Sequence, residues 1–252
     1  MNRYRIPVFF FLLLTAFSSY ADECVILLHG LARTSNSMMP LQTSLSEAGY
    51  SVVNISYPSR KKSIEELAGL AIGEGLDECA KMGAQPVNFV THSLGGILLR
   101  YYLSSPLVSN SFANSREQEI ARSVMLGPPN GGSEVVDSLK NLPGFELLNG
   151  PAGIQLGTGE ADLPKELGPV EFELGVIAGT RSINMFLSMF LPSPNDGKVS
   201  LESAKIEGMS DFVALPVNHS FMMRNKRVID EVLNFLQHGH FQNASSMSYE
   251  RG

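Results

Sequence analysis

The stretch that most constrains the fold covers residues 87–96, Val-Asn-Phe-Val-Thr-His-Ser-Leu-Gly-Gly. It begins as an apolar run, which is typical of a strand buried on both faces of a parallel sheet. The run ends abruptly at a histidine and Ser93, and two glycines follow. A sharp strand-to-helix turn, with the small residues Thr91 and Gly95 on either side, pushes the serine hydroxyl clear of the sheet. We therefore expect Ser93 to be a nucleophile, with an ordinary structural turn as the alternative.

The rest of the chain alternates strand and helix patterns. Strands are predicted at residues 24–29, 51–57, 87–91, 121–126, 172–179 and 211–217. Helices are predicted at residues 35–48, 63–82, 95–103 and 221–236. Strands that alternate with helices form a parallel sheet with helices on both faces. The predicted fold class is therefore α/β, with a central, mostly parallel sheet of about six strands.

Composition narrows the class of partner. The 252 residues are 44% hydrophobic and 17% charged, which fits one globular domain with a sizeable core. The formal net charge is −6 and the basic residues are scattered, so no nucleic-acid partner is expected. The sequence contains no phosphate-binding loop, no dinucleotide fingerprint and no ligand spacing typical of zinc. No cofactor and no metal are therefore expected.

The first residues are expected to lie outside that domain. Two arginines precede an apolar block at residues 6–17, and residues 19–21 provide small side chains at the positions that a signal peptidase recognises. Residues 1–21 are therefore predicted to be a signal peptide, and residues 22–252 the folded domain of an exported protein, periplasmic or secreted. An uncleaved membrane anchor is the alternative, although the apolar block is shorter than a typical membrane span.

Export gives the two cysteines a role. Cys24 opens the first predicted strand, and Cys79 lies near the end of the helix that precedes the strand at residues 87–91. If these two strands are parallel neighbours, both cysteines lie at the same edge of the sheet. A disulfide between Cys24 and Cys79 is therefore predicted, because an oxidising compartment favours it. Two separate buried thiols are the alternative.

A nucleophilic serine needs a base, and His219 is the best candidate. It directly follows the last predicted strand, before the final helix. His238 and His240 belong to the end of the chain. His92 adjoins the serine and is expected to face elsewhere, whereas His29 is expected to brace the loop after the first strand. A purely structural role for His219 is the alternative.

The base in turn needs an acid that orients it. Asp196 lies on a turn after the strand at residues 172–179. Asp211 begins a strand and is expected at the opposite edge of the sheet, and Asp162 lies in irregular sequence. Asp196 is therefore the predicted acid, with a simple Asx turn as the alternative.

These segments resemble those of compact bacterial α/β-hydrolases of the lipase/esterase type. The matching segments span nearly the whole predicted domain: Leu27-Leu-His-Gly-Leu-Ala-Arg33, Thr91-His-Ser-Leu-Gly-Gly96, Gly127-Pro-Pro-Asn-Gly-Gly-Ser133, Asn195-Asp-Gly-Lys-Val199 and Asn218-His-Ser220. The order Ser93, Asp196, His219 is the nucleophile–acid–base order of that superfamily. The backbone N–H of Leu94, at a helix N-terminus, is expected to face a developing oxyanion. The resemblance implies a second oxyanion N–H from Leu31.

Two details qualify the resemblance. Thr91 stands where the family pattern has its first glycine, and a small side chain is compatible with the turn. Few residues precede the strand that carries His29, which resembles small lipases more than large esterases. The resemblance implies an α/β-hydrolase fold with a small cap insertion.

The function hypothesis is hydrolysis of carboxylic esters, either small molecules or lipids, through an acyl-enzyme. An acyltransferase or thioesterase that uses the same three residues is one alternative, and a non-catalytic binding module on the same fold is another. A lipid ester would bring transient contact with a membrane or lipid surface. The sequence carries no signal for an oligomeric state.

Residues 133–170 are expected to be irregular, with a short helix at most, and to form a cap or lid-like insertion. Five apolar side chains cluster in this otherwise polar segment: Leu139, Leu142, Phe145, Leu147 and Leu148. We interpret the cluster as an acyl-binding wall or lid. A static flap that closes the core is the alternative. Some Met and Phe side chains at residues 185–190 and 221–223 are further candidates for an acyl pocket.

Overall fold

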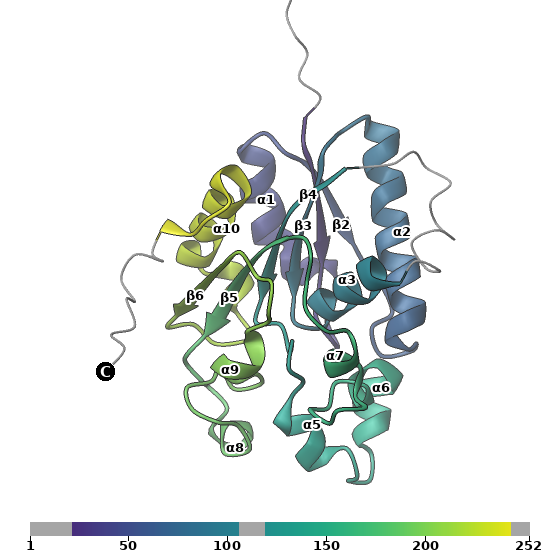
Figure 1. The fold of residues 1–252 in the computed structure, drawn as a ribbon, viewed down its shortest axis with the longest axis vertical. Coiled ribbons are helices and arrows are strands. Elements are labelled where there is room, and N and C mark those ends of the chain that lie inside the picture. Colours follow the sequence, from purple (N-terminus) through teal and green to yellow (C-terminus); the bar gives the residue numbers. More distant parts are fainter. Residues whose placement is uncertain (1–21, 106–118, 243–252) are drawn as a thin grey trace, which may run out of the picture.

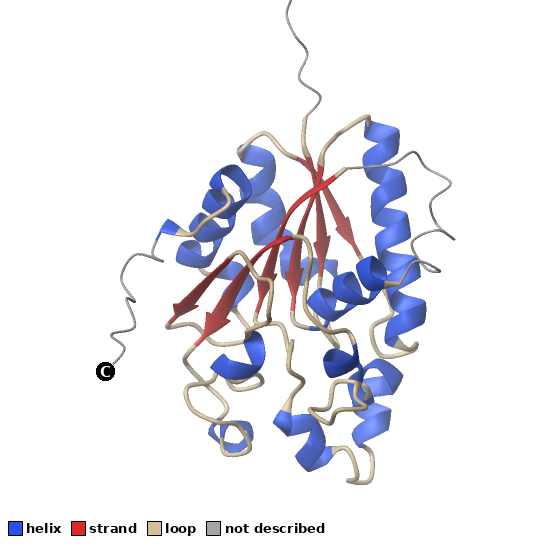
Figure 2. Cartoon of the chain, in the orientation of Figure 1, coloured by secondary structure: helices blue, strands red, loops and turns tan. Residues whose placement is uncertain are grey.

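One sheet of six parallel strands organises the described part of the chain, residues 22–105 and 119–242 of a computed structural model (Figures 1 and 2). The strands are β1 (Cys24–Leu28), β2 (Ser51–Ile55), β3 (Val87–His92), β4 (Ile120–Leu126), β5 (Glu173–Gly179) and β6 (Asp211–Leu215). Their order is β2-β1-β3-β4-β5-β6, and every neighbouring pair is parallel. The predicted α/β class is confirmed, with small shifts at the strand ends. The predicted signal peptide lies outside the described residues.

Helices cover both faces of the sheet, as expected. The helices α1 (Met39–Glu47) and α10 (Lys226–His238) lie on one face, and α2 (Ile64–Met82) and α3 (Leu94–Ser104) lie on the other (Figure 1). In β1, Ile26 and Leu28 belong to the layer with α2 and α3, whereas Val25 and Leu27 belong to the layer with α1 and α10. β1 is thus apolar on both faces, which explains its uninterrupted apolar sequence.

The helix ends follow their capping residues. Ser63 forms a capping box with Glu66 at the start of α2, and Gly83 adopts the left-handed conformation at its end. The first helix differs from the prediction, because a 3-10 helix, η1 (Ser35–Met38), precedes α1 and no side chain caps either element. The last helix begins later than predicted. The short η2 (Met222–Arg224) comes first, and Asn225 then caps α10.

Residues 133–170 contain more regular structure than expected, so the prediction of one short helix at most is wrong. They form α5 (Glu134–Leu139), α6 (Phe145–Ile154) and α7 (Leu163–Glu166). α6 has a kink at Gly150, which leaves helical geometry (φ 69°, ψ −179°). Pro151 follows the kink and starts the second helical part, where proline is tolerated. Two further short helices, α8 (Met185–Ser188) and α9 (Leu201–Ala204), follow β5.

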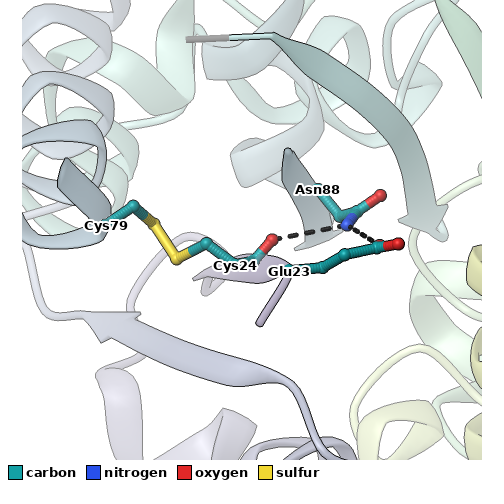
Figure 3. Close-up of a disulfide and its surroundings, with 4 residues drawn as sticks. All are labelled: Glu23, Cys24, Cys79 and Asn88. Carbon is teal, nitrogen blue, oxygen red and sulfur yellow. Dashed lines mark hydrogen bonds between the residues drawn. A yellow bond between two sulfur atoms is a disulfide. The ribbon is translucent and has the colours of Figure 1, made fainter. Parts of the chain in front are cut away.

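The predicted disulfide is present between Cys24 and Cys79 (Figure 3). It joins the start of β1 to α2, and both sulfur-bearing side chains are fully buried. Beside it, the amide of Asn88 in β3 donates to the Glu23 carboxylate (2.8 Å) and accepts from the Arg122 backbone N–H (3.0 Å). The disulfide and these hydrogen bonds therefore hold the amino-terminal edge of the sheet together.

The carboxyl ends of the strands all point toward the same side of the molecule, where α5 to α9 lie (Figure 1). In a parallel sheet this edge collects the loops that carry binding and catalytic residues. Among the helices of the described residues, none has both the length and the apolar character needed to cross a membrane.

Candidate active site

Ser93 lies at the sharp turn between β3 and α3. Its backbone has φ 54° and ψ −119°, a conformation that residues other than glycine rarely adopt. The turn needs glycine at Gly95, since a Cβ there would lie 2.7 Å from the carbonyl oxygen of Leu28 in β1. Close packing of α3 on β1 thus holds a strained, partly exposed serine at the carboxyl edge of the sheet.

His219 and Asp196 form a buried hydrogen-bonded pair at the same edge. His219 Nδ1 lies 2.7 Å from Asp196 Oδ2, and the His219 backbone N–H donates to the Asp196 carbonyl oxygen (3.1 Å). The other carboxylate oxygen, Oδ1, accepts from the backbone N–H groups of Lys198 (2.9 Å) and Val199 (2.8 Å). With Asp196 accepting at Nδ1, the proton sits on that nitrogen and His219 Nε2 is left as an acceptor.

Gly127, directly after β4, makes room for this pair. A Cβ at Gly127 would lie 3.0 Å from Asp196 Oδ2 and 3.1 Å from His219 Nδ1. Gly127 also has a positive φ of 53°, which favours glycine in its own right. The end of β4 is therefore shaped around the histidine–carboxylate hydrogen bond.

A cavity of about 290 Å³ contains Ser93 and His219 in its wall. Leu31, the expected second oxyanion donor, lines the same cavity. Leu94 begins α3 directly after the serine. Leu31, Ser93 and His219, which follow the ends of β1, β3 and β6, thus line one cavity.

The expectation that His92 faces away from the site is wrong, because His92 contacts His219. Its Nε2 lies 3.0 Å from the carbonyl oxygen of His219, and the two rings are 4.8 Å apart. A carbonyl only accepts, so Nε2 carries the proton, and the buried Nδ1 has no hydrogen-bond partner among the residues that the structure describes. Burial and then the neighbouring His219 hold the pKa of His92 well below its usual value. His92 is therefore a neutral support for the loop that carries His219.

His29 braces the loop after β1, as expected. Its Nδ1–H donates to the Gly30 carbonyl oxygen (2.9 Å), and its Nε2 accepts from the Tyr57 backbone N–H (3.2 Å). The Tyr57 ring stacks on the imidazole at 4.0 Å, and its hydroxyl donates to the His29 carbonyl oxygen. Burial lowers the pKa of His29.

A second contact, which no sequence pattern indicates, holds the next part of this loop. Ala32 has a positive φ of 56°, and its N–H donates to the buried hydroxyl of Ser59 (3.0 Å). Neither Ser59 nor Tyr57 belongs to a motif, so only the folded chain brings them against the loop. The backbone beside Leu31 is therefore fixed before any ligand arrives.

The cavity has an apolar wall on the side of the α5–α7 segment. Much of its apolar lining comes from residues 135–156 and from α8, including Val136, Leu139, Phe145, Leu148, Leu156 and Leu187. Three of the five side chains of the predicted apolar cluster thus line the cavity. The other two, Leu142 and Leu147, are exposed by 56% and 85% and do not line it.

The remaining acids and histidines lie elsewhere. Asp211, at the start of β6, accepts from the backbone N–H of Phe241 (2.7 Å), at the edge opposite Ser93. Asp162 caps a turn by accepting from Gly159 N–H (2.8 Å). His238 and His240 contact each other at the end of α10. Within residues 22–105 and 119–242, no three or more metal-ligating side chains gather.

Two cationic side chains also line the cavity, Arg33 and Lys198. The Arg33 guanidinium donates to the carbonyl oxygen of Ser220 (3.3 Å), and no ion pair to either cation occurs in the described residues. Lys198 keeps an exposed face, yet the protein around it and the charge of Arg33 lower its pKa, against an opposing effect of Asp196.

Comparisons with known proteins place the chain by fold. No family model and no curated protein matches its sequence. Bacillus licheniformis lipase BlEst2 in its mature form is 21% identical, over 86% of this chain and 91% of that one, with a TM-score of 0.60. Staphylococcus hyicus lipase is 13% identical, over 85% of this chain and 93% of that one, with a TM-score of 0.60. Aspergillus fumigatus lipase B is 14% identical, over 90% of this chain and 55% of that one, with a TM-score of 0.64.

The chain spans about half (48%) of the propeptide form of the Bacillus lipase. At these identities the similarity concerns the fold, which is the α/β-hydrolase fold. The expected fold class is thus confirmed, by the sheet and by its structural neighbours.

Proposed function

We propose that this protein is a serine hydrolase that cleaves carboxylic esters. The observation that carries the proposal is a shared cavity: a strained serine at a strand-to-helix turn and a histidine with a buried carboxylate partner line the same space. An ordinary structural turn has no need of backbone strain beside such a pair. The names of the fold neighbours agree with this chemistry.

In the proposed reaction, Ser93 Oγ attacks the carbonyl carbon of the ester while His219 Nε2 takes the hydroxyl proton. Asp196 keeps the imidazole oriented and stabilises its charged form. The backbone N–H groups of Leu31 and Leu94 stabilise the negative oxygen that develops. His219 then gives its proton to the leaving alcohol. A water molecule, activated by the same imidazole, releases the acid and regenerates Ser93.

The cavity supports a substrate with an apolar acyl part. Its walls on the α5–α6 side are apolar, and exposed apolar side chains continue outward from the same region. Burial of apolar surface is worth about 25 cal/mol per Å², so each methylene that enters such a wall strengthens binding. We infer an ester of a small molecule or a lipid, with transient contact to a lipid surface for the latter.

We further propose that residues 22–252 act as one catalytic domain in an exported protein. The disulfide supports an oxidising compartment, because cytosolic thiols stay reduced. Residues 1–21 would serve as the signal peptide.

A fluorophosphonate probe tests the catalytic proposal directly, since it reacts covalently with activated serines. The expected result is one labelled site, mapped to Ser93, together with hydrolysis of p-nitrophenyl esters. Both should vanish in Ser93→Ala. A folded wild-type protein that takes no label and hydrolyses no ester would instead be a binding module. Product analysis with added alcohol or thiol acceptors separates hydrolysis from acyl transfer, and thioester substrates test for a thioesterase.

A further inference from the structure

The catalytic cavity contains two cations that the proposed ester hydrolysis does not use. Arg33 and Lys198 line the same 290 Å³ space as Ser93 and His219. Arg33 comes from the loop after β1, and Lys198 from the loop that carries Asp196. Two separate segments thus bring positive charge to one small cavity in a chain whose net charge is negative.

The described chain provides these cations with no counter-ion. Asp196 acts on Lys198 electrostatically, but its carboxylate already accepts from His219 and from two backbone N–H groups. Within the described residues, the Arg33 guanidinium donates a hydrogen bond only to a backbone carbonyl oxygen, that of Ser220. Like charges that share a partly dehydrated wall repel each other, and a bound anion removes that cost.

We propose that Arg33 and Lys198 bind an anionic oxyacid group of the ester substrate, a phosphate or a carboxylate. A planar guanidinium donates two parallel hydrogen bonds to either group, and the ammonium adds a point charge. The apolar wall of the same cavity takes the acyl chain. The substrate class is therefore an amphiphilic ester that carries a negative charge near the scissile bond. This inference rests on the proposed ester hydrolysis and narrows its substrate.

Arg33 also borders a second cavity, of about 330 Å³, which contains Arg224 but neither Ser93 nor Lys198. An anion bound there would depend on Arg224 and not on Lys198. The variants Arg33→Gln, Lys198→Gln and Arg224→Gln therefore locate the anion. Lys205→Gln is the matched control, because Lys205 forms a surface ion pair with Glu202 and lines neither cavity.

Two substrate pairs, each with one member that carries an additional anionic group, provide the measurement. A hexanoyl-glycerol phosphate and the matching hexanoyl-glycerol place a phosphate on the alcohol side. The p-nitrophenyl monoester of glutaric acid and p-nitrophenyl pentanoate place a carboxylate on the acyl side. The quantity of interest is the ratio of kcat/KM for the anionic and the neutral member. A general loss of activity cancels in this ratio.

We expect the wild type to prefer the anionic member of at least one pair. The preference should fall about tenfold or more in Arg33→Gln and in Lys198→Gln, as for loss of one charge-assisted hydrogen bond. It should stay unchanged in Lys205→Gln. The pair that shows the preference identifies the group as phosphate or carboxylate.

Equal rates on both members of each pair would refute anion binding and leave ester hydrolysis standing. A preference that survives in Lys198→Gln but is lost in Arg224→Gln would also overturn the proposal, since the anion would then occupy the second cavity. If no ester of either kind is hydrolysed, the proposed function fails and this inference fails with it.

Discussion

At Ser93 the backbone holds a conformation that costs free energy, about 1–3 kcal/mol for such residues. Two hydrogen bonds maintain it: the Ser93 N–H donates to Leu126 O (2.9 Å), and the Gly96 N–H donates to Ser93 O (3.0 Å). An alanine at this position keeps the strain, whereas a glycine relieves it. Backbone strain lowers stability, so strain at a serine that lines a cavity indicates a functional role for that serine.

Ser93→Ala should therefore unfold at the same denaturant concentration as the wild type, and Ser93→Gly should be more stable by about 1 kcal/mol. Both should lose ester hydrolysis. Urea unfolding and hydrolysis of p-nitrophenyl esters measure the two effects. Residual activity above about a hundredth of the wild type in Ser93→Ala would point to another nucleophile.

Asp196 should matter for turnover, and Asp211 for stability alone. Asp196→Asn should reduce kcat by orders of magnitude, about 10³–10⁴, because an amide can present the wrong hydrogen-bonding atom to His219 Nδ1. Asp211→Asn weakens a backbone contact with Phe241 at the far edge and should leave kcat of the folded protein intact. Steady-state kinetics on both variants decide the matter. The opposite ranking would show that Asp196 is only part of a turn.

His92 should make stability depend on pH. The fold keeps its pKa well below the usual value, whereas the unfolded chain takes up a proton near pH 6.5. As pH falls through that value the unfolded state binds the extra proton, so the free energy of unfolding decreases, by up to about 1.4 kcal/mol per pH unit. His29, whose pKa is also lowered, acts in the same direction.

The substitution His92→Gln should flatten this dependence, since glutamine can still donate to the His219 carbonyl but does not titrate. Urea unfolding between about pH 5 and pH 7.5 measures the slope for both proteins. Identical slopes would mean that the fold leaves the pKa of His92 where it is in the unfolded chain.

Among the elements, α5 and α6 show why only part of the site could be predicted. Their apolar residues were visible in the sequence, but the proline-rich composition indicated irregular structure. The kink at Gly150 allows Pro151 to lie within α6, and no periodic pattern in the sequence predicts such a kink. Folding then divides the apolar cluster, since Phe145 and Leu148 line the cavity and Leu142 does not.

The division provides a matched test of acyl binding. Phe145→Ser should depress hydrolysis of long-chain esters by about tenfold and spare acetate esters. Leu148→Ser should act in the same direction but less strongly, because the Leu148 side chain is 65% exposed. Leu142→Ser, which changes an exposed neighbour of the same segment, should leave the chain-length profile unchanged. A uniform loss across all chain lengths would favour a static flap over an acyl-binding wall.

For the molecule as a whole, the sheet could be predicted because strand patterns alternate with helix patterns, and because burial on both faces leaves a continuous apolar run in a strand such as β1. Ser93, Asp196 and His219 could be nominated because each follows the carboxyl end of a strand. Two features could not be predicted. One is the contact between His92 and His219, and the other is that Arg33 and Lys198 line the same cavity. They depend on how loops from distant strands pack, which leaves no spacing or period in the sequence.

The disulfide acts on the stability of the whole molecule and not on its chemistry. Cys24 and Cys79 are 55 residues apart, and cross-linking them restricts the unfolded chain, which stabilises the fold by about 2–4 kcal/mol. The Cys24→Ala, Cys79→Ala double variant should unfold more easily by that amount. Its kcat should match the wild type, because Cys24 begins β1 whereas Ser93 follows the end of the parallel strand β3, at the opposite edge of the sheet. A reductant should lower the wild type to the stability of the variant and leave the variant unaffected. Two alkylatable thiols in unfolded, non-reduced protein would contradict the bond.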